Sequence, residues 1–165
     1  MDDATAKIMA DQGIWLSMQP FLDDEDATPF PAGSLNRAKQ LQMTKGTDNA
    51  YALAKKFKLK TAWGTDTLFD AKLATRQGAQ LAKMVRWYTP QEILKTVTTT
   101  NAEVLAMSGP RNPYPGKIGI VEPGAYADLL LVNGDPIANI DLFSDPARNL
   151  AIVMKDGAIY KRTQV

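Results

Sequence analysis

The side chains of this sequence that could perform chemistry are carboxylates, amines, phenols and hydroxyls. The 165 residues include no histidine and no cysteine. The chain therefore lacks the imidazole group, which is the commonest general base and metal ligand in proteins. It also lacks any thiolate nucleophile, thiolate metal site or disulfide. Hydrolysis performed by this chain alone would have to use carboxylates, lysine, tyrosine or hydroxyl groups.

Two carboxylate features occupy positions from which they could act on a ligand. The acidic cluster Asp23-Asp24-Glu25-Asp26 lies between Pro20 and Gly33, in a predicted loop of about a dozen residues. Loops of that length are usually functional or mobile, so this one is either a solvated surface loop or a lid over a substrate. Asp66 follows the β-rich run 61–65. Without further context, an aspartate after a strand is more often a helix cap or a turn residue than a catalytic group.

Composition excludes several classes of protein. Lys and Arg number 19 and Asp and Glu 18, for a net charge of +1, which argues against a nucleic-acid-binding protein. No apolar run approaches the ~20 residues of a membrane-spanning helix, and the acidic start Met1-Asp2-Asp3 is unlike a secretory signal. We therefore expect no nucleic-acid or membrane partner. The compartment stays open, with the cytoplasm as the default and the periplasm or secretion as alternatives.

The elements that must position these carboxylates alternate between helices and strands. A short helix capped by Asp2 or Asp3 precedes a predicted strand at 14–19, and a second strand is predicted at 61–66. Between them lies a helix that begins after Ser34 and ends near Lys60. Weak helix formers at 44–49 predict a break in this helix, with Asp48 capping its second half.

Further helices are predicted between the second strand and residue 110. One runs from about Lys72 to Tyr88, and another begins at the capping box Thr89-Pro90-Gln91-Glu92. A third begins at Thr100 and ends at Gly109-Pro110. This alternation indicates an α/β fold with parallel strands. Two parallel strands cannot form a buried sheet by themselves, so they need neighbours from elsewhere.

The last third of the chain has a different organisation. Strands are predicted at 127–133 and 150–155, and Asp156-Gly157 is a strong signal for a hairpin to a third strand at 158–161. We therefore expect two domains, residues 1–110 and residues 111–165, of which the second is a small antiparallel β unit.

Four segments, in the same order as in a known family, resemble the metal-dependent amidohydrolase superfamily. Residues 116–131 resemble its closing signature, a G-x-I-x-x-G-x-x-A-D-L segment, and residues 153–157 resemble the hairpin that follows. Residues 100–105 resemble the helix before the signature, and residues 62–66 resemble the G-[TS]-D end of barrel strand eight. Residues 13–20 are similar to strand seven of the imidazolonepropionase-like and prolidase-like group.

The resemblance implies a fold and explains the composition. The superfamily fold is a (β/α)8 TIM-type barrel with a β-sandwich. Residues 1–110 would supply the last two βα units, with strands seven and eight and their helices, and residues 111–165 a segment of the sandwich. The family's histidine ligands lie on strands one to six, which would precede Met1. The chain would then be the C-terminal fragment of a longer enzyme, and its partner would be the missing N-terminal barrel portion.

The resemblance also implies a function. The complete enzyme would be an amidohydrolase that uses a divalent metal, zinc, to cleave a C–N bond in a small-molecule cyclic amide or a dipeptide. Asp66 would bind the metal and act as the catalytic base, and Gln19, Thr67 and Leu68 would contact substrate. Asp128 would have a structural role in the sandwich. The chain alone should be inactive, because a catalytic zinc needs about three protein ligands.

Two other interpretations stay open. The chain could be a non-catalytic truncated module, for binding or assembly, derived from that fold. Because two barrel strands would expose their edges, a stable form of the chain is expected to be a homo-oligomer. The other interpretation is an unrelated complete α/β domain, which would leave the ordered segment matches unexplained.

Overall fold

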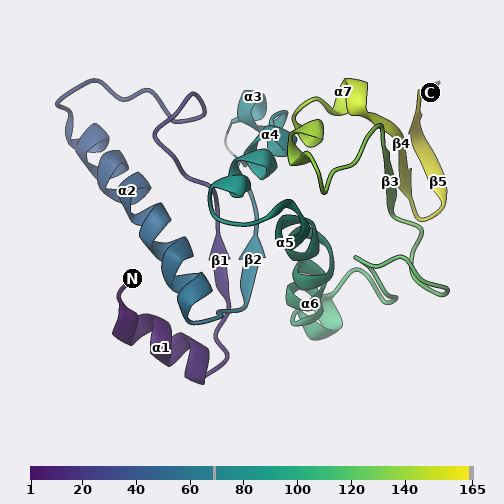
Figure 1. Ribbon diagram of the computed structural model, residues 1–165, viewed down its shortest axis with the longest axis horizontal. Coiled ribbons are helices and arrows are strands. Elements are labelled where there is room, and N and C mark those ends of the chain that lie inside the picture. Colours follow the sequence, from purple (N-terminus) through teal and green to yellow (C-terminus); the bar gives the residue numbers. More distant parts are fainter. Residues whose placement is uncertain (69, 164–165) are drawn as a thin grey trace. The chain divides into compact units, whose positions relative to one another are not determined.

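The computed structural model describes residues 1–68 and 70–163, which form helices, a parallel pair of strands and a small antiparallel sheet (Figure 1). The chain divides into two compact units, Met1–Leu73 and Ala74–Val165. The predicted α/β class with a small antiparallel sheet is confirmed. These two units are defined by the packing of the chain. The boundary expected at residues 110/111 divides the barrel portion from the sandwich portion, and it stays a prediction.

The first unit is built around a parallel βαβ arrangement. Its elements are α1 (Asp3–Asp11), β1 (Leu16–Met18), α2 (Leu35–Lys56) and β2 (Thr61–Trp63). The strands β1 and β2 pair in parallel, with Leu16 opposite Thr61 and Met18 opposite Trp63. The cap of α1 is Asp2, whose side chain accepts a hydrogen bond of 2.8 Å from the Thr5 backbone N–H. The core of this unit forms where α1 meets the C-terminal half of α2, around residues Ala6, Leu53, Ala54 and Leu59.

The predicted break in the second helix is wrong, because α2 is continuous across it. Asp48 lies inside the helix, and the N-cap of α2 is Ser34. Thr44, Thr47 and Tyr51 are all buried, and their spacing of three and four residues places them on one helical face. Packing of this face outweighs the low helix propensity of the segment. The weakest helix former, Gly46, lies on the exposed side, where its cost of about 1 kcal/mol is tolerable.

The helix predicted over residues 72–88 is also wrong in its continuity. It is replaced by α3 (Ala71–Ala74), α4 (Gln77–Ala82) and a 3-10 turn at Lys83–Arg86. The chain leaves helical geometry at Arg76, which has φ −102° and ψ 19°. Beyond this point α4 packs against residues 140–144 so closely that a Cβ on Gly78 would lie 1.8 Å from the Phe143 carbonyl oxygen. The direction of α4 is therefore set by that contact.

The capping box at Thr89 is confirmed, but the two helices predicted after it are joined. The Thr89 N–H donates to the Glu92 carboxylate at 2.8 Å, and the Glu92 N–H donates to the Thr89 hydroxyl at 3.3 Å. The chain then passes from α5 (Pro90–Lys95) through a π-helical turn (Thr96–Thr100) into α6 (Asn101–Ala106). Thr100 has helical dihedral angles and makes no capping hydrogen bond, because the preceding turn is already helical.

The second unit ends in an antiparallel sheet with the strand order β3 (Leu129–Val132), β4 (Leu150–Lys155) and β5 (Ala158–Arg162). A 3-10 turn at Ile140–Ser144 and the short helix α7 (Pro146–Asn149) connect β3 to β4. The hairpin between β4 and β5 turns at Asp156 and Gly157, which have φ values of 49° and 79°. These values suit the tight turn that the sequence predicts. In the described part of the chain, no helix is long and apolar enough to span a membrane.

Candidate functional site

The candidate site lies at the C-terminal ends of β1 and β2. Because the two strands are parallel and Met18 pairs with Trp63, the residues that follow them leave the sheet side by side. The Gly64 N–H donates to the Met18 carbonyl at 3.5 Å, which joins the two exits. Gln19 and the segment that leads to Asp66 therefore both begin at the C-terminal end of the parallel pair. In Figure 1 the chain leaves both arrows at this same end.

Asp66 has an unusual backbone conformation. Its φ is 53°, in the left-handed region that side-chain-bearing residues rarely adopt. Lys58 and Asp156 share this conformation, but Lys58 follows the end of α2 and Asp156 forms the β4–β5 hairpin, where such angles are common. Asp66 belongs to no comparable element. Backbone strain of this kind is concentrated at functional sites, where it orients a reactive side chain.

The carboxylate of Asp66 is available for a ligand. The residue is exposed, and among the described residues no hydrogen-bond or ion-pair partner for its side chain is found. A charged group with no internal partner contributes little to stability through its side chain. It can instead accept a proton or coordinate a cation supplied from outside the described residues.

The residues after Asp66 differ in their access to solvent. Leu68 is 85% exposed, whereas Thr67 is 8% exposed. The Thr67 hydroxyl lies 3.2 Å from the Thr65 hydroxyl, which indicates that it is engaged within the segment. Asp70 caps α3 by accepting a 2.8 Å hydrogen bond from the Leu73 N–H. The structure therefore leaves Leu68 open to a ligand and holds Thr67 inward. Gln19 is half-buried at the end of β1.

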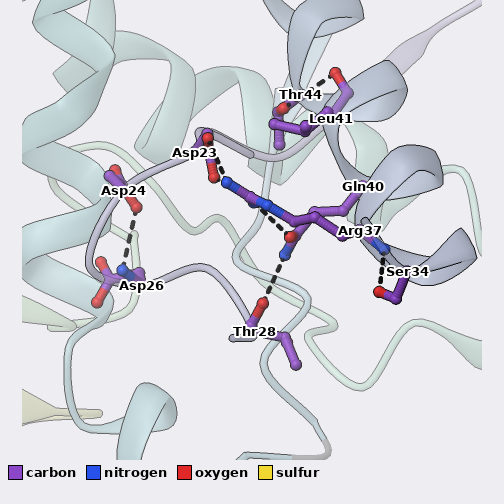
Figure 2. Close-up of polar contacts among 9 residues, drawn as sticks. All are labelled: Asp23, Asp24, Asp26, Thr28, Ser34, Arg37, Gln40, Leu41 and Thr44. Carbon is purple, nitrogen blue, oxygen red and sulfur yellow. Dashed lines mark hydrogen bonds and ion pairs between the residues drawn. The ribbon is translucent and has the colours of Figure 1, made fainter. Parts of the chain in front are cut away.

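The long loop after β1 is attached to the first turns of α2, as Figure 2 shows. The guanidinium of Arg37 donates two hydrogen bonds to the Asp23 carboxylate, of 2.5 Å from Nη1 and 2.8 Å from Nη2. Further along the loop, the Gln40 amide donates to the Thr28 carbonyl at 2.8 Å. The Arg37 guanidinium holds the pKa of Asp23 below its usual range, and Asp23 in turn raises the pKa of Arg37.

Sequence reasoning missed Arg37 and Gln40, although one signal was available. Arg37 lies in the first turn of α2, which starts after its cap Ser34. The positive end of the helix dipole disfavours a cation there. An acidic partner would offset this repulsion, and the cluster at 23–26 is the nearest group of several carboxylates in the sequence. Which of those four carboxylates it would contact depends on the path of the loop.

The described residues do not form a complete metal site. No group of three or more Asp or Glu side chains that could hold a metal ion occurs within residues 1–68 and 70–163. Asp66 can supply one carboxylate ligand, and a catalytic zinc needs about three ligands from protein.

Three solved structures share this fold and cover almost the whole chain. An amidohydrolase matches with a TM-score of 0.81 and 27% identity, over 100% of this chain and 38% of its own. A prolidase complexed with N-methylphosphonate-L-proline matches with a TM-score of 0.81 and 23% identity, over 99% of this chain and 38% of its own. The A. niger ochratoxinase matches with a TM-score of 0.77 and 21% identity, over 98% and 35%.

The chain thus spans little more than a third of the length of these structures. No curated protein sequence matches it. The sequence profile of the amidohydrolase family matches residues 1–160, nearly the entire chain. The chain belongs to the amidohydrolase family.

Proposed function

We propose that this chain supplies the last two βα units of a (β/α)8 barrel and a β-sandwich segment to a metal-dependent hydrolase. In this proposal residues 1–110 belong to the barrel, with β1 and β2 as strands seven and eight, and residues 111–165 belong to the sandwich. The parallel β1–α2–β2 arrangement and the coverage of just over a third of an amidohydrolase support it. Sites on such barrels lie at the C-terminal ends of the strands, which is where Asp66 is found.

One observation carries the proposal that Asp66 is the catalytic residue. Its exposed carboxylate is held in a left-handed backbone conformation at the end of β2, beside the end of β1. The conformation has a backbone cost, which is lower for aspartate than for most residues, and no partner of the side chain among the described residues offsets it. A role in holding or moving a proton explains why a carboxylate is placed there.

Asp66 would act on the water that attacks the substrate. A bound divalent metal such as zinc lowers the pKa of a coordinated water to about 7. Asp66 would contribute one ligand. It would accept a proton from the water as the water oxygen attacks the scissile carbonyl carbon. Asp66 would then deliver that proton to the leaving nitrogen as the C–N bond breaks. Such transfers by a positioned group contribute roughly 10²–10⁴-fold to the rate.

The substrate would be a small molecule with an amide-type C–N bond, either a dipeptide or a cyclic amide. The prolidase of the same fold is complexed with N-methylphosphonate-L-proline, which favours the dipeptide. Gln19, Thr67 and Leu68 would border the substrate. Leu68 would offer an apolar surface, because its side chain is almost fully exposed, whereas Thr67 would act through its backbone because its hydroxyl faces Thr65.

A second candidate function is a non-catalytic module for binding or assembly. It is favoured by the incomplete set of metal ligands among the described residues. Such a module would have unpaired strand edges at β1 and β2, as would the isolated chain. These edges would pair with a second copy and produce a homo-oligomer. Light scattering on the purified chain tests this expectation, and a compact monomer would contradict it.

The decisive experiment compares Asp66 with a nearby aspartate of known structural role. In the complete enzyme, meaning the longer protein in which we propose that this chain operates, D66N should lower kcat for dipeptide or cyclic-amide hydrolysis by at least ~100-fold. D70N should leave kcat unchanged, because an asparagine can still cap α3. Full turnover by D66N would refute the catalytic role. The 165-residue chain should bind zinc below one equivalent and show no turnover.

A further inference from the structure

The loop of residues 19–33, called here the β1–α2 loop, contains no helix or strand. Some of its turns are closed by short-range hydrogen bonds: the Asp26 N–H donates to the Asp24 carboxylate at 3.0 Å, and the Ala27 N–H to the Asp24 carbonyl at 3.0 Å. Such turns bend the chain locally. They do not by themselves hold a loop of this length in one place relative to a sheet.

Two side chains of α2 tie this loop to the helix. Arg37 binds the Asp23 carboxylate through both of its terminal nitrogens, and Gln40 binds the Thr28 carbonyl. Figure 2 shows both contacts, with the Arg37 and Gln40 side chains next to each other. Residues three apart on a helix share a face, and Arg37 Nη1 also donates to Gln40 Oε1 at 2.7 Å. The two tethers therefore form a single connected unit.

The geometry of this unit distinguishes it from an ordinary surface ion pair. An exposed pair of single contacts contributes little to stability, but bidentate arginine–carboxylate pairs are an exception. The Arg37 side chain is only 28% exposed. Gln40 is 8% exposed and uses both its amide nitrogen and its oxygen. Removing either side chain would leave the other without the 2.7 Å hydrogen bond that joins Arg37 to Gln40.

The tethered loop begins at the candidate site. It leaves β1 at Gln19, beside the segment that carries Asp66. We propose that Arg37 is a positioning residue, which together with Gln40 holds the β1–α2 loop beside the ends of β1 and β2 so that the loop forms one wall of the substrate site. The assignment of the ends of β1 and β2 as a substrate site rests on the proposed function. The attachment of the loop to α2 through Arg37 is independent of that function.

The first test measures loop order in the 165-residue chain by hydrogen exchange and mass spectrometry. D23N should speed exchange of peptides covering residues 19–33 by about fivefold to tenfold, because a charge-assisted bidentate contact is lost, while exchange in α2 stays unchanged. R37K should not restore slow exchange, because a single ammonium cannot make the two-pronged contact. The matched control is D11N, which removes the carboxylate of the Lys7–Asp11 ion pair on α1.

The second test uses the charge-swapped pair. R37D alone should free the loop as strongly as D23N, and combining it with D23R should recover part of the protection. A loop that exchanges equally fast in the wild type and in D23N would overturn the proposal. So would an equal effect of D11N on the same peptides.

Kinetics of the complete enzyme test the link to the substrate. D23N should raise KM at least threefold and lower kcat by a smaller factor, since the loop would shape binding and Asp66 the chemistry. An unchanged KM despite a freed loop would refute the substrate-wall assignment. The two proposals fail separately: full turnover by D66N would remove the proposed function, whereas the exchange experiment on D23N would still report on the tether.

Discussion

Replacing Asp66 by glycine should stabilise the folded chain, even though Asp66 is the residue that we propose for catalysis. The φ of 53° lies in the left-handed region, which glycine adopts without a steric penalty. The Asp66 side chain is exposed, and its substitution removes no hydrogen bond or ion pair found among the described residues. The substitution therefore relieves backbone strain and costs no contact.

The magnitude follows from two opposing contributions. A left-handed conformation costs an ordinary residue about 1–2 kcal/mol, and somewhat less for aspartate, whose short polar side chain tolerates it. Glycine loses more backbone freedom on folding, which costs about 0.4–1 kcal/mol. D66G should therefore raise the free energy of unfolding by about 0.5 kcal/mol. D66A should lower it by a similar amount, because alanine meets the full penalty, and D66N should change it little.

Urea unfolding of the purified chain measures these differences, and Lys58 provides the matched control. Lys58 has a φ of 52°, almost the same as that of Asp66, but it follows the end of α2 and has no proposed role in chemistry. K58G should gain about 1 kcal/mol for the same reason. In the complete enzyme, K58G should keep full activity whereas D66G should lose it. Both substitutions should therefore stabilise the chain, but only the one at Asp66 should abolish activity.

One result would refute this reasoning. If K58G is more stable than the wild type while D66G is less stable by more than about 1 kcal/mol, then Asp66 makes a stabilising contact in the folded chain. Its conformation would then be a structural requirement, and the strain would no longer support a catalytic role.

Three further predictions concern the second unit. G119A should lower the free energy of unfolding by about 2–4 kcal/mol, because residue 119 has φ 74° and a Cβ there would lie 2.6 Å from the Thr98 carbonyl oxygen. I93V should cost about 1 kcal/mol, because Ile93 is 2% exposed; urea unfolding measures both. The Asp128 pKa is lowered by the Lys155 ammonium and then by a backbone N–H. Its contribution to stability should be complete above the ordinary carboxyl range near pH 4 and be lost as pH falls through the lowered pKa. D128N should show a smaller loss of stability over that range in unfolding curves recorded between pH 2 and 6, as roughly expected from linkage.

Two of these three predictions have a control variant in the same unit. G124A shares a positive φ of 86° but has open space around the new Cβ, so only the backbone penalty of about 1–2 kcal/mol applies. Equal losses in G119A and G124A would contradict the contact with Thr98. I137V should leave the free energy of unfolding almost unchanged, because Ile137 is 56% exposed. An acid-stability profile identical in D128N and the wild type would show that the Asp128 contacts add nothing.

Local signals in the sequence predicted the elements whose stabilising contacts are also local. The capping box at Thr89 and the turn at Asp156-Gly157 each depend on residues within four positions of one another. Their chemistry is complete before any tertiary packing occurs. The alternation of helices and strands was predicted for the same reason, because hydrophobic period is a property of the segment itself.

The errors occurred where distant residues decide the local conformation. The helix α2 continues through residues with low helix propensity because Thr44, Thr47 and Tyr51 are buried on one face. The predicted helix at 72–88 is interrupted because α4 meets residues 140–144, some sixty positions further along the chain. Propensity contributes at most about 1 kcal/mol per residue, so tertiary packing overrides it.

In the candidate site, too, some features were predictable from the sequence and others depended on contacts between distant segments. The absence of histidine and cysteine limited the candidate bases and ligands to carboxylates, lysine, tyrosine and hydroxyl groups, and the family motif at residues 62–66 indicated that Asp66 follows the end of a strand. The left-handed backbone of Asp66 and the pairing of Arg37 with Asp23 were decided only by the tertiary structure. The physical reason is that both depend on the path of the chain between elements. Residue types restrict that path, but contacts between segments far apart in sequence select it.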